Sequence, residues 1–131
     1  MRRFLLGAIF FMMCAFASAE GIDGVWRTED NDDGAHLEVT FGPCDSDATK
    51  VCGLITAAIS REGLSIAYEN VGKLMIRDMV SNDGRSFSGG TLWDPEKDKI
   101  VRSKLVVTGD DLRVIGCIAF ICVKQTWARL D

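Results

Sequence analysis

Two short cysteine pairs constrain the fold of this 131-residue chain more than any other feature. Cys44 and Cys52 enclose the segment DSDATKV, and Cys117 and Cys122 enclose the apolar segment IAFI. Four cysteines in a small exported domain favour two disulfides, for which three connectivities are possible. We favour Cys44–Cys52 with Cys117–Cys122, because residues 112–127 have the pattern of two strands joined by a tight turn. Cysteines that face each other across such a hairpin lie within disulfide reach.

The fifth cysteine, Cys14, lies in an N-terminal segment typical of a secretory signal peptide. Two arginines are followed by an apolar run and by the small residues Ala-Ser-Ala, which end at Ala19. The apolar run is shorter than the ~20 residues that a membrane-spanning helix needs. We therefore predict a cleaved signal peptide over residues 1–19 and a single periplasmic or secreted domain over residues 20–131. Cleavage removes Cys14 and leaves an even number of cysteines.

The charge of the expected mature chain is acidic. Loss of Arg2 and Arg3 lowers the 15 basic residues to 13, against 19 acidic ones, which gives a net charge of −6. This balance predicts no basic patch for nucleic acid or anionic lipid. No second apolar stretch is long enough for a transmembrane segment in the mature chain.

Short runs with strand-like alternation, separated by turn residues, dominate the rest of the chain. This pattern predicts an all-β fold, a small antiparallel barrel or sandwich of eight or nine strands in one domain. The pair Gly89-Gly90 inside one run predicts a bulge or a sharp bend. The expected strands cover residues 24–28, 35–41, 51–59, 64–69, 73–80, 86–93, 100–107 and the hairpin over 112–127.

The two ends of the mature chain carry residues that suit a barrel closure. Gly24-Val25-Trp26 opens the first run, and Arg129 shares a face of the last run with Trp127. In lipocalin-like (calycin) barrels, a G-x-W tryptophan packs beneath an arginine or lysine of the last strand. The stacking of an arginine on an indole stabilises the fold by roughly 0.5–2 kcal/mol. We expect Trp26 and Arg129 to form such a structural plug; the alternative is an ordinary core tryptophan and a solvated arginine.

Several segments together resemble a bacterial family of exported proteins, domain-of-unknown-function family 2147 (DUF2147). They are GVWRTEDNDDGAHLEV, VCG, GGTLWDPEKDK, LRVIGCIAFIC and KQTWARL. The resemblance covers most of the mature chain and implies a small lipocalin-like β-barrel and export, with no established reaction. Residues 60–70, SREGLSIAYEN, depart from the family pattern because they lack its Asn-Pro element.

Catalytic and metal-binding patterns are scarce, and we expect no catalytic residues, no metal and no cofactor. A zinc site would need closer cysteine spacing or a histidine in either pair, and the single histidine, His36, belongs to neither. His36 alternates with apolar residues, so we expect it to be solvated. Asp94 and Glu96 flank a proline and suit a turn. EDNDDG, residues 29–34, matches a calcium loop at only some positions and suits a polar turn.

Two apolar features remain as candidate sites. The first is the barrel interior, which either is filled by side chains or holds one small ligand. The second is the tip of the last hairpin, Ile118, Phe120 and Ile121, which we expect either to dock a partner or, as we favour, to fold inward as a lid with Phe120 buried. The expected barrel lining is Phe41, Leu54, Met75, Met79, Phe87, Trp93 and Leu105.

These features favour a non-catalytic, exported binding protein for a small apolar or amphipathic ligand in the barrel mouth. The alternative is a periplasmic inhibitor that docks onto an enzyme partner, a protease or a lysozyme. An empty cavity would favour the first function, and a filled barrel with Phe120 exposed would favour the second.

Overall fold

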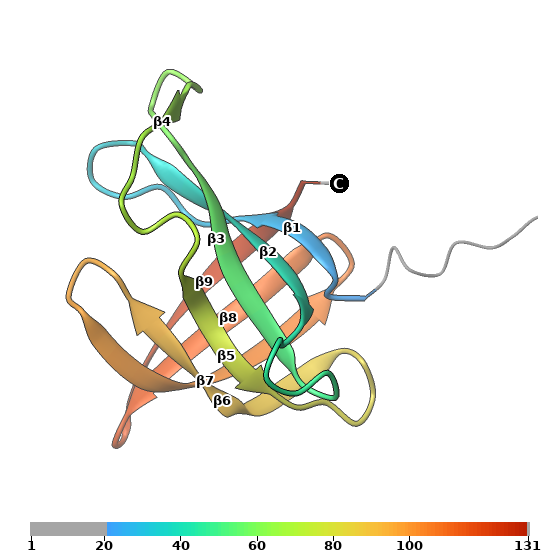
Figure 1. The fold of residues 1–131 in the computed structure, drawn as a ribbon. Coiled ribbons are helices and arrows are strands. Elements are labelled where there is room, and N and C mark those ends of the chain that lie inside the picture. Colours follow the sequence, from blue (N-terminus) through green and yellow to red (C-terminus); the bar gives the residue numbers. More distant parts are fainter. Residues whose placement is uncertain (1–20, 131) are drawn as a thin grey trace, which may run out of the picture.

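The structure, a computed structural model, describes residues 21–130, which form one closed antiparallel barrel (Figure 1). The predicted signal peptide lies outside the described residues. Within them, no helix is long and apolar enough to cross a membrane. The strands are β1 (Gly24–Arg27), β2 (His36–Pro43), β3 (Val51–Ile59), β4 (Ser65–Ile66), β5 (Leu74–Met79), β6 (Ser86–Asp94), β7 (Lys99–Thr108), β8 (Asp111–Ile118) and β9 (Ile121–Arg129).

The barrel closes because β2, at one end of the strand order, also pairs with β3. Strands β5 to β9 each pair with the next strand in sequence. β9 then pairs with β1, β1 with β2, β2 with β3, and β3 with β5. The short β4 pairs only with the end of β3, so eight strands form the barrel. The predicted all-β, disulfide-stapled barrel is thereby confirmed. The predicted strand over 64–69 shortens to Ser65–Ile66, because hydrogen-bonded turns on both sides leave only two residues to pair.

The glycine pair produces the predicted bulge between β6 and β7. The register shifts between Phe87 and Gly90, and Gly89 has a φ of +85°. A Cβ on Gly90 would lie 2.0 Å from the carbonyl oxygen of Arg77 on the neighbouring β5. Gly89 therefore supplies a left-handed backbone, and Gly90 supplies the space for close approach of two strands.

Side chains fill only one half of the barrel, which we call the closed half. Its largest fully buried residues include Trp26, Trp127, Met79, Leu105 and Leu112. The other end is framed by the β1–β2 loop, the β6–β7 turn, β4 and the β8–β9 tip, which lie together on the left of Figure 1. We call this end the mouth.

Trp26 and Arg129 meet at the closed half in the stacked geometry expected for a plug. The two residues are register partners, and the guanidinium carbon lies 4.3 Å from the centroid of the indole ring. Trp26 Nε1 donates to the carbonyl of Ile22 at 2.8 Å. Arg129 Nη2 donates to the carbonyl of Gly109 at 2.9 Å, and its side chain is only 7% exposed. The indole and the guanidinium are thus fixed by their stacking contact and by one hydrogen bond each to a backbone carbonyl.

Both disulfides have the favoured local connectivity. The Cα atoms of Cys44 and Cys52 are 4.9 Å apart, and those of Cys117 and Cys122 are 4.1 Å apart. The second pair occupies facing positions of β8 and β9, directly behind the tip. Such facing positions bring two Cα atoms within bridging distance.

Candidate functional site

The mouth half of the barrel contains a cavity of about 670 Å³. Its volume lies within the range of about 300–1,000 Å³ that is usual for small-molecule sites. Residues from β2, β3, β5 to β9 and the mouth loops line it. Its apolar lining is Ala35, Leu37, Ala58, Ile66, Met75, Leu92, Pro95, Val101, Val114, Gly116, Ile118, Ile121, Val123 and Trp127.

The cavity wall is apolar and has a tryptophan at its base. Trp127 is buried in the core and also lines the cavity, and its Nε1 donates to Gln125 Oε1 at 2.8 Å. Gln125, Val123 and Ile121 alternate on the same face of β9 as Trp127. Val123 is 68% exposed although it faces the cavity. An apolar wall is therefore open to solvent.

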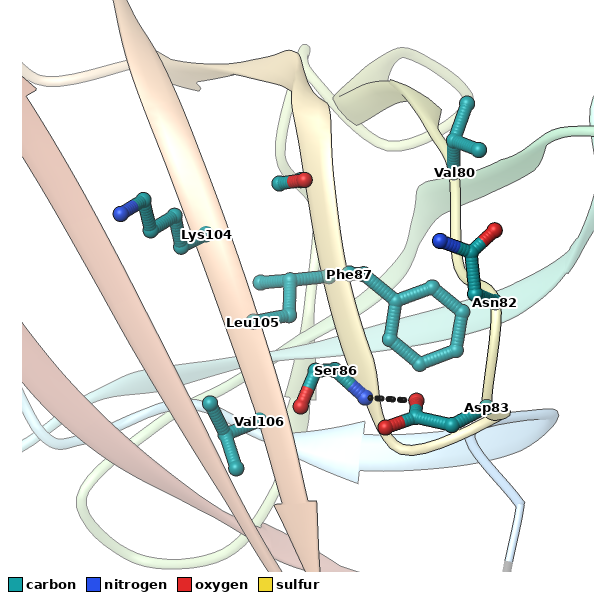
Figure 2. Close-up of a pocket in the computed structure, with 9 residues that line it drawn as sticks. Val80, Asn82, Asp83, Ser86, Phe87, Lys104, Leu105 and Val106 are labelled. Carbon is teal, nitrogen blue, oxygen red and sulfur yellow. Dashed lines mark hydrogen bonds between the residues drawn. The ribbon is translucent and has the colours of Figure 1, made fainter.

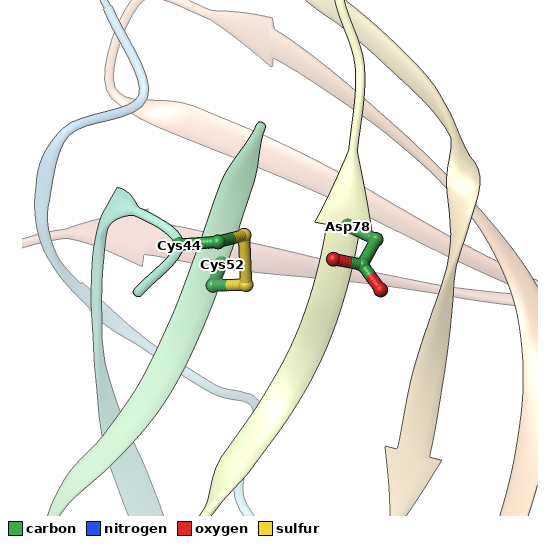
Figure 3. A group of neighbouring side chains, drawn as sticks. All are labelled: Cys44, Cys52 and Asp78. Carbon is green, nitrogen blue, oxygen red and sulfur yellow. A yellow bond between two sulfur atoms is a disulfide. The ribbon is translucent and has the colours of Figure 1, made fainter. Parts of the chain in front are cut away.

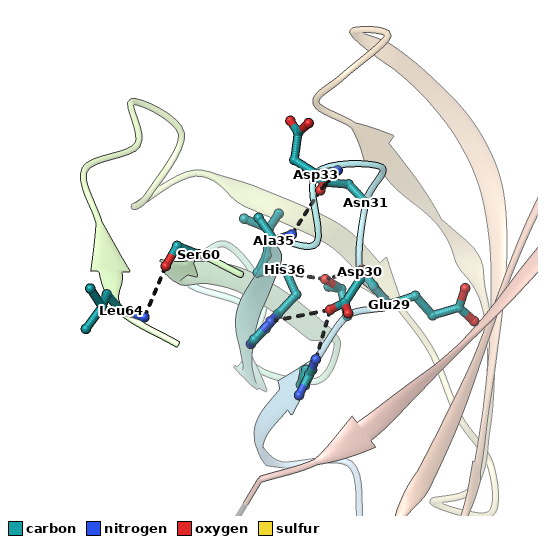
Figure 4. A network of polar contacts seen from close by, with 11 residues as sticks. Glu29, Asp30, Asn31, Asp33, Ala35, His36, Ser60 and Leu64 are labelled. Carbon is teal, nitrogen blue, oxygen red and sulfur yellow. Dashed lines mark hydrogen bonds and ion pairs between the residues drawn. The ribbon is translucent and has the colours of Figure 1, made fainter. Parts of the chain in front are cut away.

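One side of the mouth carries a polar network around His36 (Figure 4). Asp30 Oδ1 accepts from Arg27 Nη2 at 2.8 Å and lies 3.7 Å from His36 Nδ1. The imidazole is only 10% exposed, so the expectation of a freely solvated histidine is wrong. Burial, and then the nearby Arg27, lower the pKa of His36, which favours its neutral form.

Two carboxylates at the mouth, those of Glu29 and Asp94, hold loops in place. Glu29 Oε2 accepts the backbone N–H of Thr126 at 2.8 Å, which links the first loop to β9 beyond the last β1–β9 pair. Asp94 Oδ1 accepts the backbone N–H of Glu96 at 2.9 Å, as a turn residue does. Glu29 and Asp94 therefore have a structural role in fixing the loops.

The EDNDDG segment forms the expected polar turn. Asn31 Oδ1 accepts the backbone N–H groups of Asp33 and Ala35 at 2.9 and 3.0 Å (Figure 4). The side-chain oxygen that a calcium loop would direct at the ion is therefore used by the backbone.

The structure separates the predicted lining residues into four groups, the last of which is Leu54 alone. Phe41, Met79, Phe87 and Leu105 are buried in the core of the closed half, whereas Met75 lines the cavity. Trp93 lies apart from both, with Nε1 donating to Asp98 Oδ1 at 2.9 Å.

Leu54 is placed on the outer face, 36% exposed. Register shifts on either side of Gly53 displace the alternation of β3, so Leu54 does not face inward. As a prediction of cavity lining, Leu54 is wrong, and the four core residues named above do not line the mouth cavity either. Sequence reasoning missed Leu92, Val101 and Val123, which alternation marks as inward-facing without giving their depth in the barrel.

The hairpin tip is divided between the cavity and solvent. Ile118 and Ile121 line the mouth, whereas Phe120 is 99% exposed. The favoured expectation of a buried, lid-like Phe120 is therefore wrong. Ala119 and Phe120 are the two central turn residues, with Ala119 at a φ of +56°, and their side chains do not belong to either paired face.

A second recess, of about 430 Å³, lies beside the β5–β6 loop (Figure 2). Its acidic residue, Asp83, accepts the backbone N–H groups of Ser86 and Arg85, each at 2.9 Å. These bonds, that from Ser86 first, lower the pKa of Asp83. Asp83 therefore serves the turn, and we place the candidate site in the mouth cavity.

Cys44, Cys52 and Asp78 form a group of potential metal-ligand atoms within 4.8 Å of one another (Figure 3). The two sulfur atoms are joined in a disulfide, so neither is a thiolate able to bind a metal. The group does not fit a metal site in this oxidised form.

Positive charge gathers on the outer face of the barrel, contrary to the expectation that an acidic chain has no basic patch. We call Arg77, Arg102, Lys104, Arg113 and Lys124 the basic face; all five are exposed. Lys104 and Lys124 both flank Ile115, and Arg102 flanks Cys117. No carboxylate occupies the outward positions of β7 to β9 between Arg113 and the tip. The sequence did not indicate the basic face because its residues come from four strands. Only the register of strand pairing brings them together.

Comparisons with known proteins agree with this architecture. The solved structure of protein HP1028 from Helicobacter pylori, described as belonging to the lipocalin family, has a TM-score of 0.64 and 16% identity. The match covers 84% of this chain and 83% of that chain. No curated protein matches the sequence. The family described as uncharacterized protein conserved in bacteria (DUF2147) matches residues 24–129, which is most of the chain. The chain therefore belongs to the DUF2147 family and has a lipocalin-like fold.

Proposed function

We propose that this protein binds a small apolar or amphipathic ligand in the mouth cavity and does not transform it. The observation that carries this proposal is the cavity of about 670 Å³ in a barrel whose other half contains the cluster of buried core side chains. Counting about 30 Å³ per water, the space equals about twenty waters, or a ligand of about twenty non-hydrogen atoms. An apolar wall beneath a charged rim suits a ligand with one polar end.

The rim supports binding more than catalysis. Of the four carboxylates that line the cavity, Glu29 and Asp94 are engaged by backbone N–H groups and Asp30 is paired with Arg27; the fourth is Glu96. A general acid or base needs a free group directed at a substrate. We place the protein in an oxidising compartment, the periplasm, because two disulfides are typical of exported domains and residues 1–19 have the pattern of a signal peptide.

The test is titration with N-phenyl-1-naphthylamine, a neutral fluorophore that brightens in apolar surroundings. We expect saturable binding to a single site. Val123→Glu should weaken binding at least about tenfold, because it places a charge on the cavity wall. Ile100→Glu is the matched control, since Ile100 is 67% exposed, like Val123 at 68%, but lies outside the cavity. Equal effects of the two variants, or no saturable binding, would contradict the proposal.

Exposure of Phe120 favours one alternative, inhibition of a periplasmic protease or lysozyme by docking of the tip. Exposed aromatic residues are common anchors of protein interfaces. Inhibition assays with wild type and Phe120→Ala distinguish the two functions. Inhibition that disappears in Phe120→Ala but persists in Val123→Glu would support docking, whereas absence of inhibition together with fluorophore binding supports the ligand proposal.

A further inference from the structure

The β8–β9 tip exposes apolar side chains at the edge of the mouth. Phe120 is fully exposed, and Ile118 and Ile121 are exposed beside it. The Cys117–Cys122 disulfide joins the strands one residue behind these isoleucines. The tip is therefore a rigid apolar projection, and exposure of such a projection to water is unfavourable unless it contacts another surface.

The basic face begins next to this tip. Arg102 is the register partner of Cys117, and Lys124 is two residues from Cys122, about 7 Å along the strand. Lys104 lies across Ile115 from Lys124. None of these three cations has an ion-pair partner among the described residues. Long basic side chains can extend toward a charged surface while their stems lie against apolar groups.

We propose that the tip and the basic face dock the protein on an anionic lipid bilayer. This inference goes beyond ligand binding and does not depend on it. A wedge of Ile118, Phe120 and Ile121 would enter the headgroup region, and the cations would contact the lipid phosphates. Each lysine or arginine near an anionic membrane adds several-fold to binding. Because Ile118 and Ile121 also line the cavity, docking places the β8–β9 edge of the mouth at the bilayer surface.

The size and chemistry of the patch distinguish a bilayer from other polyanionic or apolar partners. A four-residue tip is far smaller than the roughly 800 Å² per partner that stable protein complexes bury. A nucleic acid would neutralise the cations but leave the apolar tip in water. A bilayer satisfies both, since a few apolar side chains and a few cations together suffice for interfacial binding.

The experiment measures co-sedimentation of the oxidised mature protein with two kinds of vesicle. One kind is phosphatidylcholine alone, and the other contains one-third phosphatidylglycerol. We expect at least about tenfold stronger binding to the anionic vesicles at about 0.1 M salt, and loss of this preference at about 0.5 M. Equal binding to both vesicles, or retention on heparin without vesicle binding, would overturn the proposal.

Variants measure the contributions of the tip and of the basic face to vesicle binding separately. Phe120→Ala should weaken binding about fivefold, and Lys104→Ala with Lys124→Ala at least about tenfold. The matched controls are Leu64→Ala, an exposed leucine on the loop before β4, and Lys50→Ala in the β2–β3 loop. All five positions lie outside the buried core, so melting temperatures should stay unchanged. Wild-type binding by both test variants, or equal loss in the controls, refutes docking through these residues.

Discussion

Removal of the Arg129 side chain tests how the barrel is closed. The guanidinium stacks on Trp26 with only 7% of the side chain exposed, so the cation–π contact contributes about 1–2 kcal/mol. Its hydrogen bond to the Gly109 carbonyl contributes about 1 kcal/mol, and the aliphatic stem adds packing on the indole. We therefore expect Arg129→Ala to lower the free energy of unfolding by about 3 kcal/mol. For a domain of this size, that corresponds to a fall in Tm of about 10–15 °C.

Urea unfolding, followed by tryptophan fluorescence, measures this loss. Arg129→Lys keeps the charge but not the planar stack, so it should recover only a minor part of the lost stability. Asp110→Ala is the control for the ion pair: Asp110 lies 3.3 Å from Arg129 Nε but is 88% exposed. Its removal should cost less than about 0.5 kcal/mol. A loss below about 1 kcal/mol in Arg129→Ala, or an equal loss in Asp110→Ala, would refute the plug.

Two further predictions concern the bulge and the histidine. Gly90→Ala should cost more than about 3 kcal/mol in urea unfolding, because its Cβ would collide with the Arg77 carbonyl, whereas Gly89→Ala should cost about 1–2 kcal/mol for its positive φ alone; similar losses would contradict the close approach. The folded pKa of His36 lies below its ordinary value of 6.5, so its contribution to stability is complete above pH 6.5 and is lost as the pH falls through the folded pKa. His36→Gln should remove this part of the pH dependence of unfolding, and an unchanged profile would contradict burial of the imidazole.

The barrel and its disulfides were predictable because they depend on local signals. Alternating apolar residues identify strands, and the short spacing of Cys117 and Cys122 across a tight turn identifies a facing pair. The glycine pair marked the bulge for the same reason. These features require only knowledge of residues that are close in sequence.

The candidate site was less predictable because it depends on register. Alternation separates inward from outward residues, but it does not tell whether an inward residue such as Leu105 or Val101 lies in the closed half or at the mouth. The shifts around Gly53 turned Leu54 outward, which no sequence signal marked. Lys104 and Lys124 are neighbours only through the pairing of three strands, so a count of charges concealed the basic face.

The closed half and the mouth, both of which Trp127 contacts, should also differ in local stability. Amide groups of β strands around Trp26, Leu105 and Leu112 lie among fully buried side chains, and they should exchange with solvent only on global unfolding. Those near Ile121 and Val123 border an open cavity and should exchange through small local openings. Substitutions of apolar residues that line the mouth should therefore cost less folding stability than substitutions in the closed half.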